Sequence, residues 1–493
     1  GSKTAVGAAV GGRVSATWLL SRMTSAKAGL FLPVFIILLA YLYSRRTDNV
    51  LRERLDQVLD GLLRAEKKVS VAPKTKVAVG FGGCMDVFVN ATQFLQRFGA
   101  VPPESPAHHD VVRDQEGLEE VFAYFFRSGA AAERFVSDEN LFKKVVEFTK
   151  SMPHARWTMG GNAPVMANRF ASEGFEVFLG AKSTKNTKKY VHAAVGGDQE
   201  HDDVHFVMEY DVGDIWGKYT ATRANRFIIH SDDSNPTISA LENFADALKG
   251  QSIDLLVVGG LQMLDNFPFR TGERQTRLKK LDDFLAAVPK KTMIHFEMAS
   301  FTEEALLQDL GKHVLPYSDS LGANEQELPN LYSVLTGGKI VLLSDSNPRL
   351  AVVLDQMRAV FRALRERKPG KNQRRVTRLH IHTLAYQVIL TVKGSSWKNT
   401  MSAAAKAALT AHRHTCGKLD IDTNDARMIM DDSFATSKNQ GSRRISLDNN
   451  RPVSCWDEEN YEICVAPVLV CTKILQTAGG GDNISSAGLV LQI

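Results

Sequence analysis

Three glycines directly precede an aspartate near the carboxyl end, in the segment Gly479-Gly480-Gly481-Asp482. The segment follows an apolar run and opens a helical pattern, so its amides converge at a helix N-terminus, where the helix dipole favours negative charge. A carboxylate beside such an anion hole can accept a hydroxyl proton while the amides stabilise a transferring phosphoryl group. The pattern indicates phosphoryl transfer with Asp482 as base, and a plain helix cap after a glycine turn is the alternative.

Two glutamates stand at predicted strand ends in patterns that suit a divalent cation. Glu297 closes the segment His295-Phe296-Glu297, and Glu327 closes the segment Asn324-Glu325-Gln326-Glu327. The carboxyl ends of parallel strands share one edge of a sheet, where these carboxylates could meet. Mg²⁺ takes oxygen ligands directly or through water and bridges phosphates, so Glu297, Glu327 and Asp482 are candidate metal residues. Taken singly, each pattern is also explained by a satisfied histidine or a solvated helix start.

Two glycine-containing turns carry side chains suited to a polyol. The first turn ends at Asp86, and the second holds Gly161 and Asn162 before a predicted helix. A carboxylate and an amide can hydrogen-bond several sugar hydroxyls, and glycine lets the backbone approach a ligand closely. Plain strand-to-helix turns are the alternative. The chain has no GxxxxGK[ST] segment, which disfavours a P-loop nucleotidase.

The elements that must position these residues alternate along the chain. Helix-length segments separate short apolar runs at 77–81, 177–179, 255–259, 293–296, 340–343, 379–382 and 388–392. This rhythm predicts an α/β protein with a largely parallel sheet covered on both faces. The pattern is interrupted within 87–155 and 183–250, which we interpret as segments of a smaller inserted lid in a catalytic region spanning 76–493. The polar stretch 404–450 is predicted to be a loop-rich excursion.

The amino-terminal region predicts a membrane contact. An apolar stretch at 29–43 is flanked by basic residues, so residues 1–47 form a candidate signal or anchor segment. Its roughly 15 residues are shorter than the ~20 that a spanning helix prefers, which leaves a cleaved signal, an uncleaved signal-anchor and a buried helix open. Residues 48–75 then predict an amphipathic helix and a linker.

Composition and cysteine spacing narrow the class of protein. The 493 residues are 44% hydrophobic and 23% charged, values typical of a globular chain. The net charge of +5 is mild and has no long run of one sign, and we expect a monomer with no nucleic-acid partner. The five cysteines are too widely spaced for a zinc ribbon. Cys416 could pair with Cys471 in an oxidising compartment, and buried free thiols are the alternative.

Taken in order, the motifs resemble the ADP-dependent glucokinase family, in particular its eukaryotic members of the endoplasmic reticulum. The resemblance runs from about residue 76 to residue 493. Besides the turns and glutamate segments above, it rests on the segments at 129–135, 205–210, 224–228, 322–327, 380–384 and 467–471.

This resemblance implies a fold and a reaction. The expected fold is a ribokinase-like, Rossmann-type three-layer sandwich with a smaller α/β lid domain. The expected reaction moves the β-phosphoryl group of Mg²⁺-bound ADP to the 6-hydroxyl of glucose, which gives glucose 6-phosphate and AMP as the first step of glycolysis. The alternatives are an ATP-dependent ribokinase-type sugar or nucleoside kinase and an inactive, membrane-tethered sugar- or nucleotide-binding protein.

The resemblance also implies roles for single residues. Asp482 matches the family's base, and Glu297 and Glu327 match positions that organise Mg²⁺. Arg226 is a candidate phosphate contact. The residues that form the anion hole are Gly479, Gly480 and Gly481. Those that match the sugar site are Asp86, Glu133, Gly161, Asn162 and His205.

Overall fold

The computed structural model describes residues 35–40, 48–72, 74–185, 187, 194–341, 345 and 347–493. The chain divides into two compact units, Gly1–Asp56 and Gln57–Ile493. In the first unit, the described residues 35–40 and 48–56 are helical. None of the described helices is long and apolar enough to cross a membrane, and residues 29–34 and 41–43 of the predicted apolar segment lie outside the described residues.

The second unit is built on a sheet of nine strands in the order β19-β20-β15-β14-β13-β12-β11-β1-β6. The six strands from β14 to β6 run parallel, while β15, β20 and β19 each pair antiparallel with the strand before them. The bounds are β1 (Lys76–Gly80), β6 (Glu176–Gly180), β11 (Leu255–Val258), β12 (Met293–Glu297), β13 (Ser320–Asn324), β14 (Arg378–His382), β15 (Tyr386–Val392), β19 (Ser454–Glu458) and β20 (Tyr461–Pro467).

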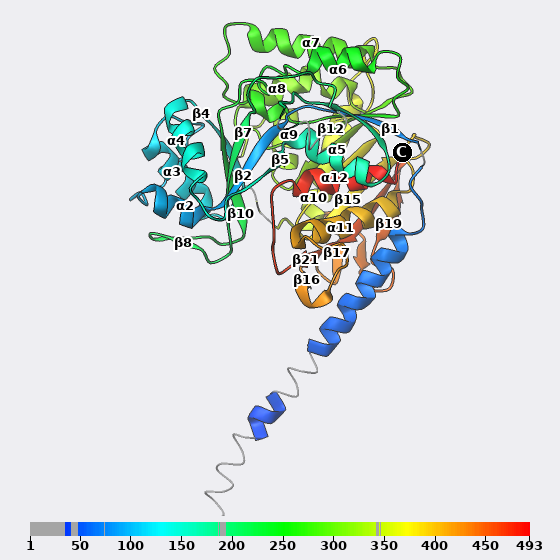
Figure 1. The fold of residues 1–493 in the computed structure, drawn as a ribbon. Helices are drawn as coiled ribbons and strands as arrows, with labels where there is room; N and C mark the ends of the chain where they lie inside the picture. The colour runs from blue at the N-terminus through cyan, green and yellow to red at the C-terminus, as the bar shows by residue number, and fades with distance from the viewer. Residues whose placement is uncertain are drawn as a thin grey trace, which may run out of the picture. The chain divides into compact units, whose positions relative to one another are not determined.

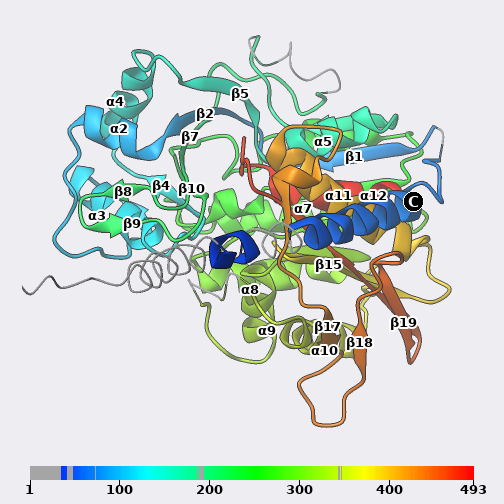
Figure 2. The same cartoon turned by 90° about the horizontal axis from the view of Figure 1, so that it is seen from below.

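Helices cover both faces of this sheet, and β11 is accordingly apolar along its whole length rather than alternating (Figure 1). One layer consists of α5 (Asn162–Ser172), α11 (Thr400–Cys416) and α12 (Gly480–Val490), which lie side by side (Figure 2). The other layer consists of α6 (Leu241–Leu248), α7 (Glu273–Ala287), α8 (Glu304–His313), α9 (Glu327–Leu335) and α10 (Leu350–Glu366). The predicted three-layer α/β sandwich is thus confirmed.

A second sheet of six strands, in the order β3-β4-β10-β7-β2-β5, forms the smaller domain, which we call the lid. Its strands are β2 (Cys84–Asn90), β3 (Val111–Val112), β4 (Ala132–Val136), β5 (Arg156–Gly160), β7 (Val204–Tyr210) and β10 (Asn225–His230). Helices α2 (Ala91–Phe98), α3 (Gln115–Phe126) and α4 (Glu139–Thr149) pack on one face of it around an aromatic core (Figure 1). β2 follows β1 after three residues, which ties the lid directly to the larger sheet.

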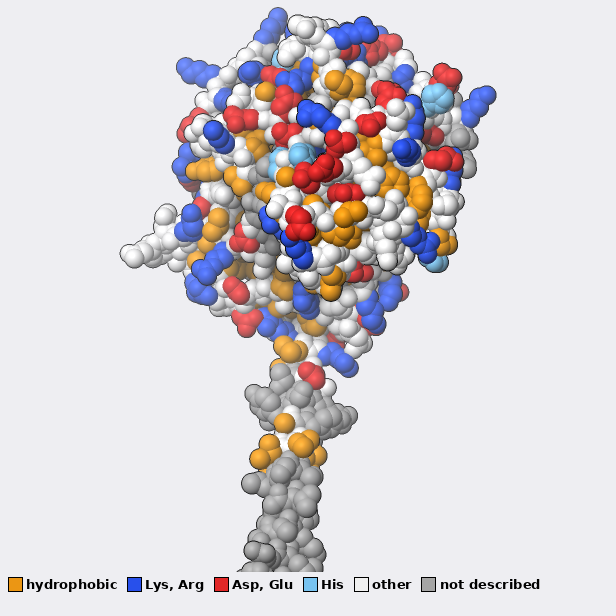
Figure 3. Space-filling view, turned by 90° about the vertical axis from the view of Figure 1, so that its left-hand side faces the viewer, with side chains coloured by type: hydrophobic (Ala, Val, Ile, Leu, Met, Phe, Trp, Pro, Cys, Tyr) orange, Lys and Arg blue, Asp and Glu red, His pale blue; other side chains and the backbone are white. Residues whose placement is uncertain are grey.

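Short strand pairs complete the fold. They are β8 (Ile215–Trp216) with β9 (Tyr219–Thr220), β16 (Ala426–Met428) with β21 (Leu469–Cys471), and β17 (Ser433–Ala435) with β18 (Arg444–Ser446). Short 3-10 turns lie at η1 (Leu261–Leu264), η2 (Leu315–Tyr317) and η3 (Thr423–Asp425). Figure 3 shows basic and acidic side chains interspersed over the lid side of the molecule.

Two sequence predictions about elements need correction. The stretch 404–416 is not a loop but most of α11, whose alanines at 403–405 and 407–408 are buried. Small side chains let this helix lie close to β15, β20 and α12, a packing that the polar residues further along concealed. The run at 340–343 was predicted to be a strand, but Ile340 and Val341 lie in none, and residues 342–343 are outside the described residues.

Candidate active site

The predicted catalytic turn forms the start of α12. Gly479 is its N-cap with φ of 69°, a left-handed conformation that suits glycine, and Gly480 and Gly481 open the helix. Asp482 therefore lies in the first turn, where the helix dipole favours negative charge. Its Oδ1 accepts a hydrogen bond of 3.0 Å from Nδ2 of Asn162. Burial, with a contribution from the charge of Glu297, raises the pKa of Asp482 to about 7.

Asn162 is held at the N-terminus of α5 by a close crossing of backbones. Gly161 precedes it with φ of 86°, and a Cβ atom there would lie 2.2 Å from the carbonyl oxygen of Gly82. Any larger residue at Gly161 would push the two turns apart. The glycine that the sequence placed in the sugar site therefore acts as the support that brings Asn162 to Asp482.

Glu297 ends β12 and is fully engaged by its neighbours. Its Oε2 lies 2.8 Å from Nε2 of His295 and accepts a hydrogen bond from Ser485 Oγ, and its Oε1 lies 3.1 Å from Nε2 of His382. Burial favours the protonated acid, but the hydrogen bonds from the two histidines outweigh it and hold the pKa of Glu297 well below its usual range. A Cβ atom at Gly322 would lie 2.0 Å from Glu297 Oε2, so only glycine leaves room for this carboxylate.

Glu327 lies at the first position of α9 and folds back on the preceding strand end. Its two oxygens accept hydrogen bonds from the backbone N–H of Asn324 at 2.8 Å and from the Asn324 side-chain amide at 2.7 Å. Burial raises the pKa of Glu327 to about 8, and the charges of Glu297 and Glu325 raise it further against the opposing effect of His382. Glu327, Glu297 and Asp482 thus share one electrostatic environment, as predicted for the edge of a parallel sheet.

The three carboxylates fit a divalent cation in a particular way. Burial and mutual repulsion raise the pKa values of Glu327 and Asp482, which is the condition that a nearby cation relieves. Within the described residues, the acid, histidine and cysteine groups whose ligand atoms converge within 4.8 Å lie elsewhere. The site therefore suits Mg²⁺ held through water and phosphate oxygens, the mode this ion prefers, rather than in a closed protein cage.

Three of the five sugar residues predicted from sequence, Asp86, Glu133 and His205, lie on the lid sheet, whereas Gly161 and Asn162 lie at the start of α5. Strand register places Asp86, His205 and His230 in one row across β2, β7 and β10. His205 is buried, with Nδ1 3.2 Å from Glu133 and Nε2 2.9 Å from Asp232. Burial disfavours the imidazolium, but interactions with Asp232 and Cys84 outweigh it and raise the pKa of His205 well above its usual value.

Asp232, which the sequence did not single out, anchors this cluster. It is completely buried, and burial is outweighed by His205 and His230, so that its pKa lies well below the usual range. Asn235 Nδ2 donates to Asp232 Oδ2 at 2.6 Å and to the carbonyl oxygen of Gly83 at 3.0 Å. The cluster is thereby fixed to the first turn of the polyol site.

Asp86 stands at the other side of His205, beside a free thiol. Cys84 Sγ donates to Asp86 Oδ1 at 3.1 Å, and burial raises the pKa of Asp86 to about 6. A Cβ atom at Gly160 would lie 2.0 Å from the Asp86 carboxyl carbon, so glycine is required there too.

A polar pocket lies where lid and core meet. Its lining combines lid residues with residues from the loops after β11 and β12, and consists of Asp110, Glu133, Phe135, His230, Gln262, Asp265, Asn266, Ser300 and Thr302. Of these described residues, three are carboxylates and none is lysine or arginine. The described lining is therefore polar and predominantly acidic.

Arg226 lies on β10 of the lid, and its charge acts on Asp482. It lowers the pKa of Asp482, a sign that its charge is close to the carboxylate, and its Nε is buried without a hydrogen-bond partner. Its NH1 donates to Asn225 Oδ1 at 3.1 Å, which leaves other donors for an oxyanion. The arrangement agrees with the predicted phosphate contact, which remains a prediction.

The structure sorts the predicted residues into two groups. Asp482, Asn162, Glu297, Glu327 and Arg226 lie around the start of α12, while the lid cluster consists of Asp86, Glu133 and His205. Sequence reasoning did not assign His382, Ser485, Asp232 or Gln262 to the site. His382 and Ser485 had a signal, because His382 belongs to the segment 380–384 at a strand end and Ser485 follows Asp482 by three residues in the same helix, but Asp232 and Gln262 had none.

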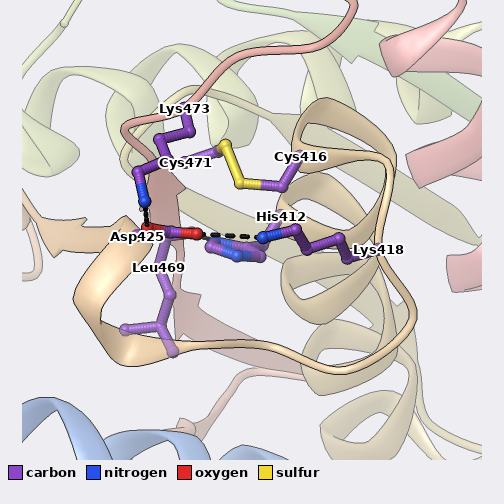
Figure 4. Close-up of a disulfide and its surroundings, with 7 residues drawn as sticks. All are labelled: His412, Cys416, Lys418, Asp425, Leu469, Cys471 and Lys473. Atoms are coloured by element: carbon purple, nitrogen blue, oxygen red, sulfur yellow. Dashed lines mark hydrogen bonds and ion pairs between the residues drawn. A yellow bond between two sulfur atoms is a disulfide. The ribbon is translucent and has the colours of Figure 1, made fainter.

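The core contains two disulfides. Cys416, at the end of α11, and Cys471, at the end of β21, form a bridge, which is one of the two alternatives that the sequence left open (Figure 4). Beside it, His412 Nδ1 lies 2.7 Å from the carbonyl oxygen of Leu469. A second bridge, between the directly paired Cys455 and Cys464 of β19 and β20, was not predicted.

Comparisons with known proteins agree with this geometry. Residues 75–491 match the ADP-specific phosphofructokinase/glucokinase conserved region. ADP-dependent glucokinase of Bos taurus is 34% identical over 425 residues, with 84% of each chain covered. A probable ADP-dependent glucokinase of Caenorhabditis elegans is 27% identical over 488 residues, with 94% of each chain covered.

Solved structures show the same fold at low identity. An ADP-dependent kinase in complex with fructose 6-phosphate and ADPβS superposes with a TM-score of 0.60 at 17% identity, covering 89% of this chain and 97% of that one. A hypothetical ADP-dependent phosphofructokinase of Pyrococcus horikoshii OT3 gives a TM-score of 0.54 at 17% identity, covering 85% of this chain and 98% of that one. The match across residues 75–491, together with the bovine relative, shows that the chain belongs to the ADP-specific phosphofructokinase/glucokinase family.

Proposed function

We propose that the protein is an ADP-dependent glucokinase, which transfers the β-phosphoryl group of ADP to the 6-hydroxyl of glucose and releases glucose 6-phosphate and AMP. The observation that carries this proposal is Asp482, held by Asn162 in the first turn of α12 with its pKa raised to about 7. A carboxylate with that pKa is a stronger proton acceptor than an ordinary aspartate, and about half of it is ionised at neutral pH.

The residues around Asp482 have separate tasks in the transfer. Asp482 accepts the proton of the attacking hydroxyl, and the N–H groups at the start of α12 face the negative charge on the phosphoryl group. Arg226 adds a positive charge from the lid side. Mg²⁺, when bound near Glu297 and Glu327, neutralises phosphate charge and orients the donor. Closure of the lid on the core would exclude water, which otherwise competes with the sugar.

Glucose is favoured over a sugar phosphate by the pocket's charge. The family includes phosphofructokinases, whose acceptor carries a phosphate, and such a group needs cationic or amide partners. Here the described lining residues include Asp110, Glu133 and Asp265 and neither lysine nor arginine. An unphosphorylated sugar avoids the repulsion that these carboxylates would impose on a phosphate.

The decisive experiment is a product assay of purified protein with Mg²⁺, crossing two donors with two acceptors. We expect turnover with ADP and glucose, little with ATP, and little with fructose 6-phosphate. Activity with ATP alone would keep Asp482 as base but replace the donor and support the ATP-dependent alternative. Absence of turnover with every pair would favour the inactive binding protein, which the presence of Asp482, Glu297 and Glu327 now opposes.

We further propose that the protein resides in the endoplasmic reticulum, tethered by the amino-terminal apolar segment. The support is the apolar stretch at 29–43 and the two bridges, since disulfides persist in oxidising compartments. Protease treatment of intact microsomes tests this: the catalytic region should be protected until detergent is added. Digestion without detergent would place it on the cytosolic side.

A further inference from the structure

Gln262 occupies a fixed position between the pocket and the catalytic turn. It is the second residue of η1, directly beyond the end of β11, and it is 9% exposed. Gly260 before it has φ of 71°, and a Cβ atom there would lie 2.3 Å from the carbonyl oxygen of Phe81. The backbone of Phe81 in turn donates to Gly259 O at 2.9 Å. The loop that carries Gln262 is therefore held against Phe81, in the turn that leads from β1 into the lid strand β2.

Two side-chain amides connect Gln262 to Asp482, and the carboxylate fixes the orientation of both. An ionised carboxylate only accepts hydrogen bonds, so Asn162 must present its NH₂ group to Asp482, at 3.0 Å. The Asn162 oxygen then faces Gln262, which must present its own NH₂ group, at 2.7 Å. The order of donors and acceptors is thus determined from Asp482 outward.

This order leaves one atom of the chain without a partner. Gln262 Oε1 is buried and accepts no hydrogen bond. A buried acceptor without a partner is unfavourable, and Gln262 also lines the polar pocket beside Glu133 and His230. What the atom lacks is a hydroxyl or N–H donor, and a sugar presents several hydroxyls.

We propose that Gln262 both recognises the sugar and positions the base: Oε1 accepts a hydrogen bond from a glucose hydroxyl other than the 6-hydroxyl, and Nε2 holds Asn162 against Asp482. The proposal rests on the proposed glucokinase function for the identity of the sugar. Binding of the sugar completes the chain of hydrogen bonds and lowers the freedom of Asn162. Occupancy of the pocket is thereby coupled to the orientation of Asp482, which favours transfer to sugar over transfer to water.

The two roles are separated by two substitutions. Gln262→Leu removes both the acceptor and the donor. Gln262→Glu keeps an acceptor for the sugar but cannot donate to Asn162 when ionised. The matched control is Gln251→Leu, which changes an exposed glutamine after α6. Each protein is assayed with glucose and with analogues that lack one of the hydroxyls at carbons 1 to 4, and kcat and KM are measured separately.

For the sugar contact, we expect that one of the deoxy analogues binds roughly 10- to 100-fold more weakly than glucose in the unchanged protein. In Gln262→Leu that same analogue should bind as tightly as glucose does. In Gln262→Glu, glucose should still bind more tightly than the analogue. A purely structural role of Gln262 would weaken glucose and all analogues alike. If each analogue loses the same factor in Gln262→Leu as in the unchanged protein, the sugar contact is wrong.

For the positioning role, we expect Gln262→Glu to lower kcat about 10-fold or more while KM for glucose changes little. An unchanged kcat in that variant would overturn it. Failure of the glucokinase function itself would show differently, as absence of turnover in the unchanged protein. Calorimetric titration of glucose and the deoxy analogues, without any donor, then still tests the contact to Gln262.

Discussion

The candidate site has a cluster of carboxylates and histidines at each of its two ends. One cluster lies on the lid sheet, and the other lies at the edge of the core sheet. In the lid, His205 lies between Glu133 and Asp232, and the pKa values of both carboxylates are lowered. At the core edge, the histidines satisfy Glu297, while burial and repulsion raise the pKa values of Glu327 and Asp482.

The difference between the clusters shows what each end lacks. In the lid, Glu133 and Asp232 are stabilised in their ionised forms by His205, so this cluster can present fixed donors and acceptors to a neutral ligand. At the core edge, two carboxylates remain poorly stabilised until a cation approaches. The charges of Glu133, His205 and Asp232 thus balance within the lid, whereas those of Glu327 and Asp482 would be balanced by a cation bound at the core edge.

The largest effect expected is at Asp482, on which the distinction between the two ends depends. Asp482→Asn keeps the shape of the side chain but removes the base, and kcat should fall by about 10²- to 10⁴-fold. Affinity for glucose, measured by calorimetry, should change little because the lid cluster remains intact. The control is Asp246→Asn, an exposed aspartate with 69% side-chain exposure. A variant at Asp482 that retains more than a tenth of kcat would remove it from the role of base.

Glu297 tests whether the core end needs a cation. Glu297→Gln keeps the size of the side chain but removes the charge between His295 and His382, and we expect kcat to fall about 100-fold. A titration of Mg²⁺ at fixed ADP should require a higher concentration for half-maximal rate. Glu147→Gln, at an exposed helix position, should leave the titration unchanged. An unshifted titration in Glu297→Gln would show that the glutamate only supports the fold.

His205 tests the lid end. His205→Gln removes the cation that stabilises Glu133 and Asp232, so KM for glucose should rise about 10-fold while kcat falls less. His313→Gln is the matched control, since His313 also contacts an aspartate, Asp282, at 3.1 Å but lies outside the site. A loss confined to kcat in His205→Gln would show that this histidine acts with the core-edge cluster around Asp482 instead.

The two ends of the site should also differ in their dependence on pH, since the core end governs kcat and the lid end governs glucose affinity. Asp482 must be ionised to accept a proton, and burial raises its pKa to about 7, so kcat should decline as pH falls through about 7. An ordinary aspartate would keep the rate constant down to about pH 4. Glucose affinity should stay nearly constant from pH 8 to about 7 and change as pH falls through about 6, because the pKa of Asp86 is raised to about 6 while that of His205 is raised well above 6.5 and that of Glu133 is lowered. A flat kcat profile between pH 8 and about 5 would contradict the assignment of Asp482.

The sequence predicts the two ends of the site unequally well. Gly479 to Asp482 are consecutive, and Glu297 follows a short apolar strand, so local pattern suffices to find them. Asp232 and Gln262 lie in turns, and their roles depend on hydrogen bonds to His205 and Asn162, which are far away in the chain. The local sequence around them therefore does not predict these roles. The parallel sheet followed from alternating apolar runs, but the buried alanine helix α11 did not, since its residues are small rather than strongly apolar.

The smallest expected effect is on Tm and concerns the disulfides, which link segments of the core but none of the lid. Both bridges lie in the core, and Cys84 of the lid is the free cysteine. Chain-entropy arguments assign about 4 kcal/mol to closing the loop between Cys416 and Cys471 and about 3 kcal/mol to the shorter loop between Cys455 and Cys464. Serine variants at the first pair should therefore lower Tm by more than those at the second, by a margin of a few degrees or less.

Activity should remain in both serine pairs at temperatures well below the transition, because neither bridge contacts a residue of the lid cluster or Asp482 in the described contacts. Thermal unfolding followed by circular dichroism, with and without a reducing agent, provides the measurement. A reducing agent should lower Tm of the unchanged protein to that of the doubly substituted one. If reduction instead abolished glucose binding at low temperature, the bridges would be coupled to the lid, and the division of the molecule into a covalently tied core and an untied lid would be wrong.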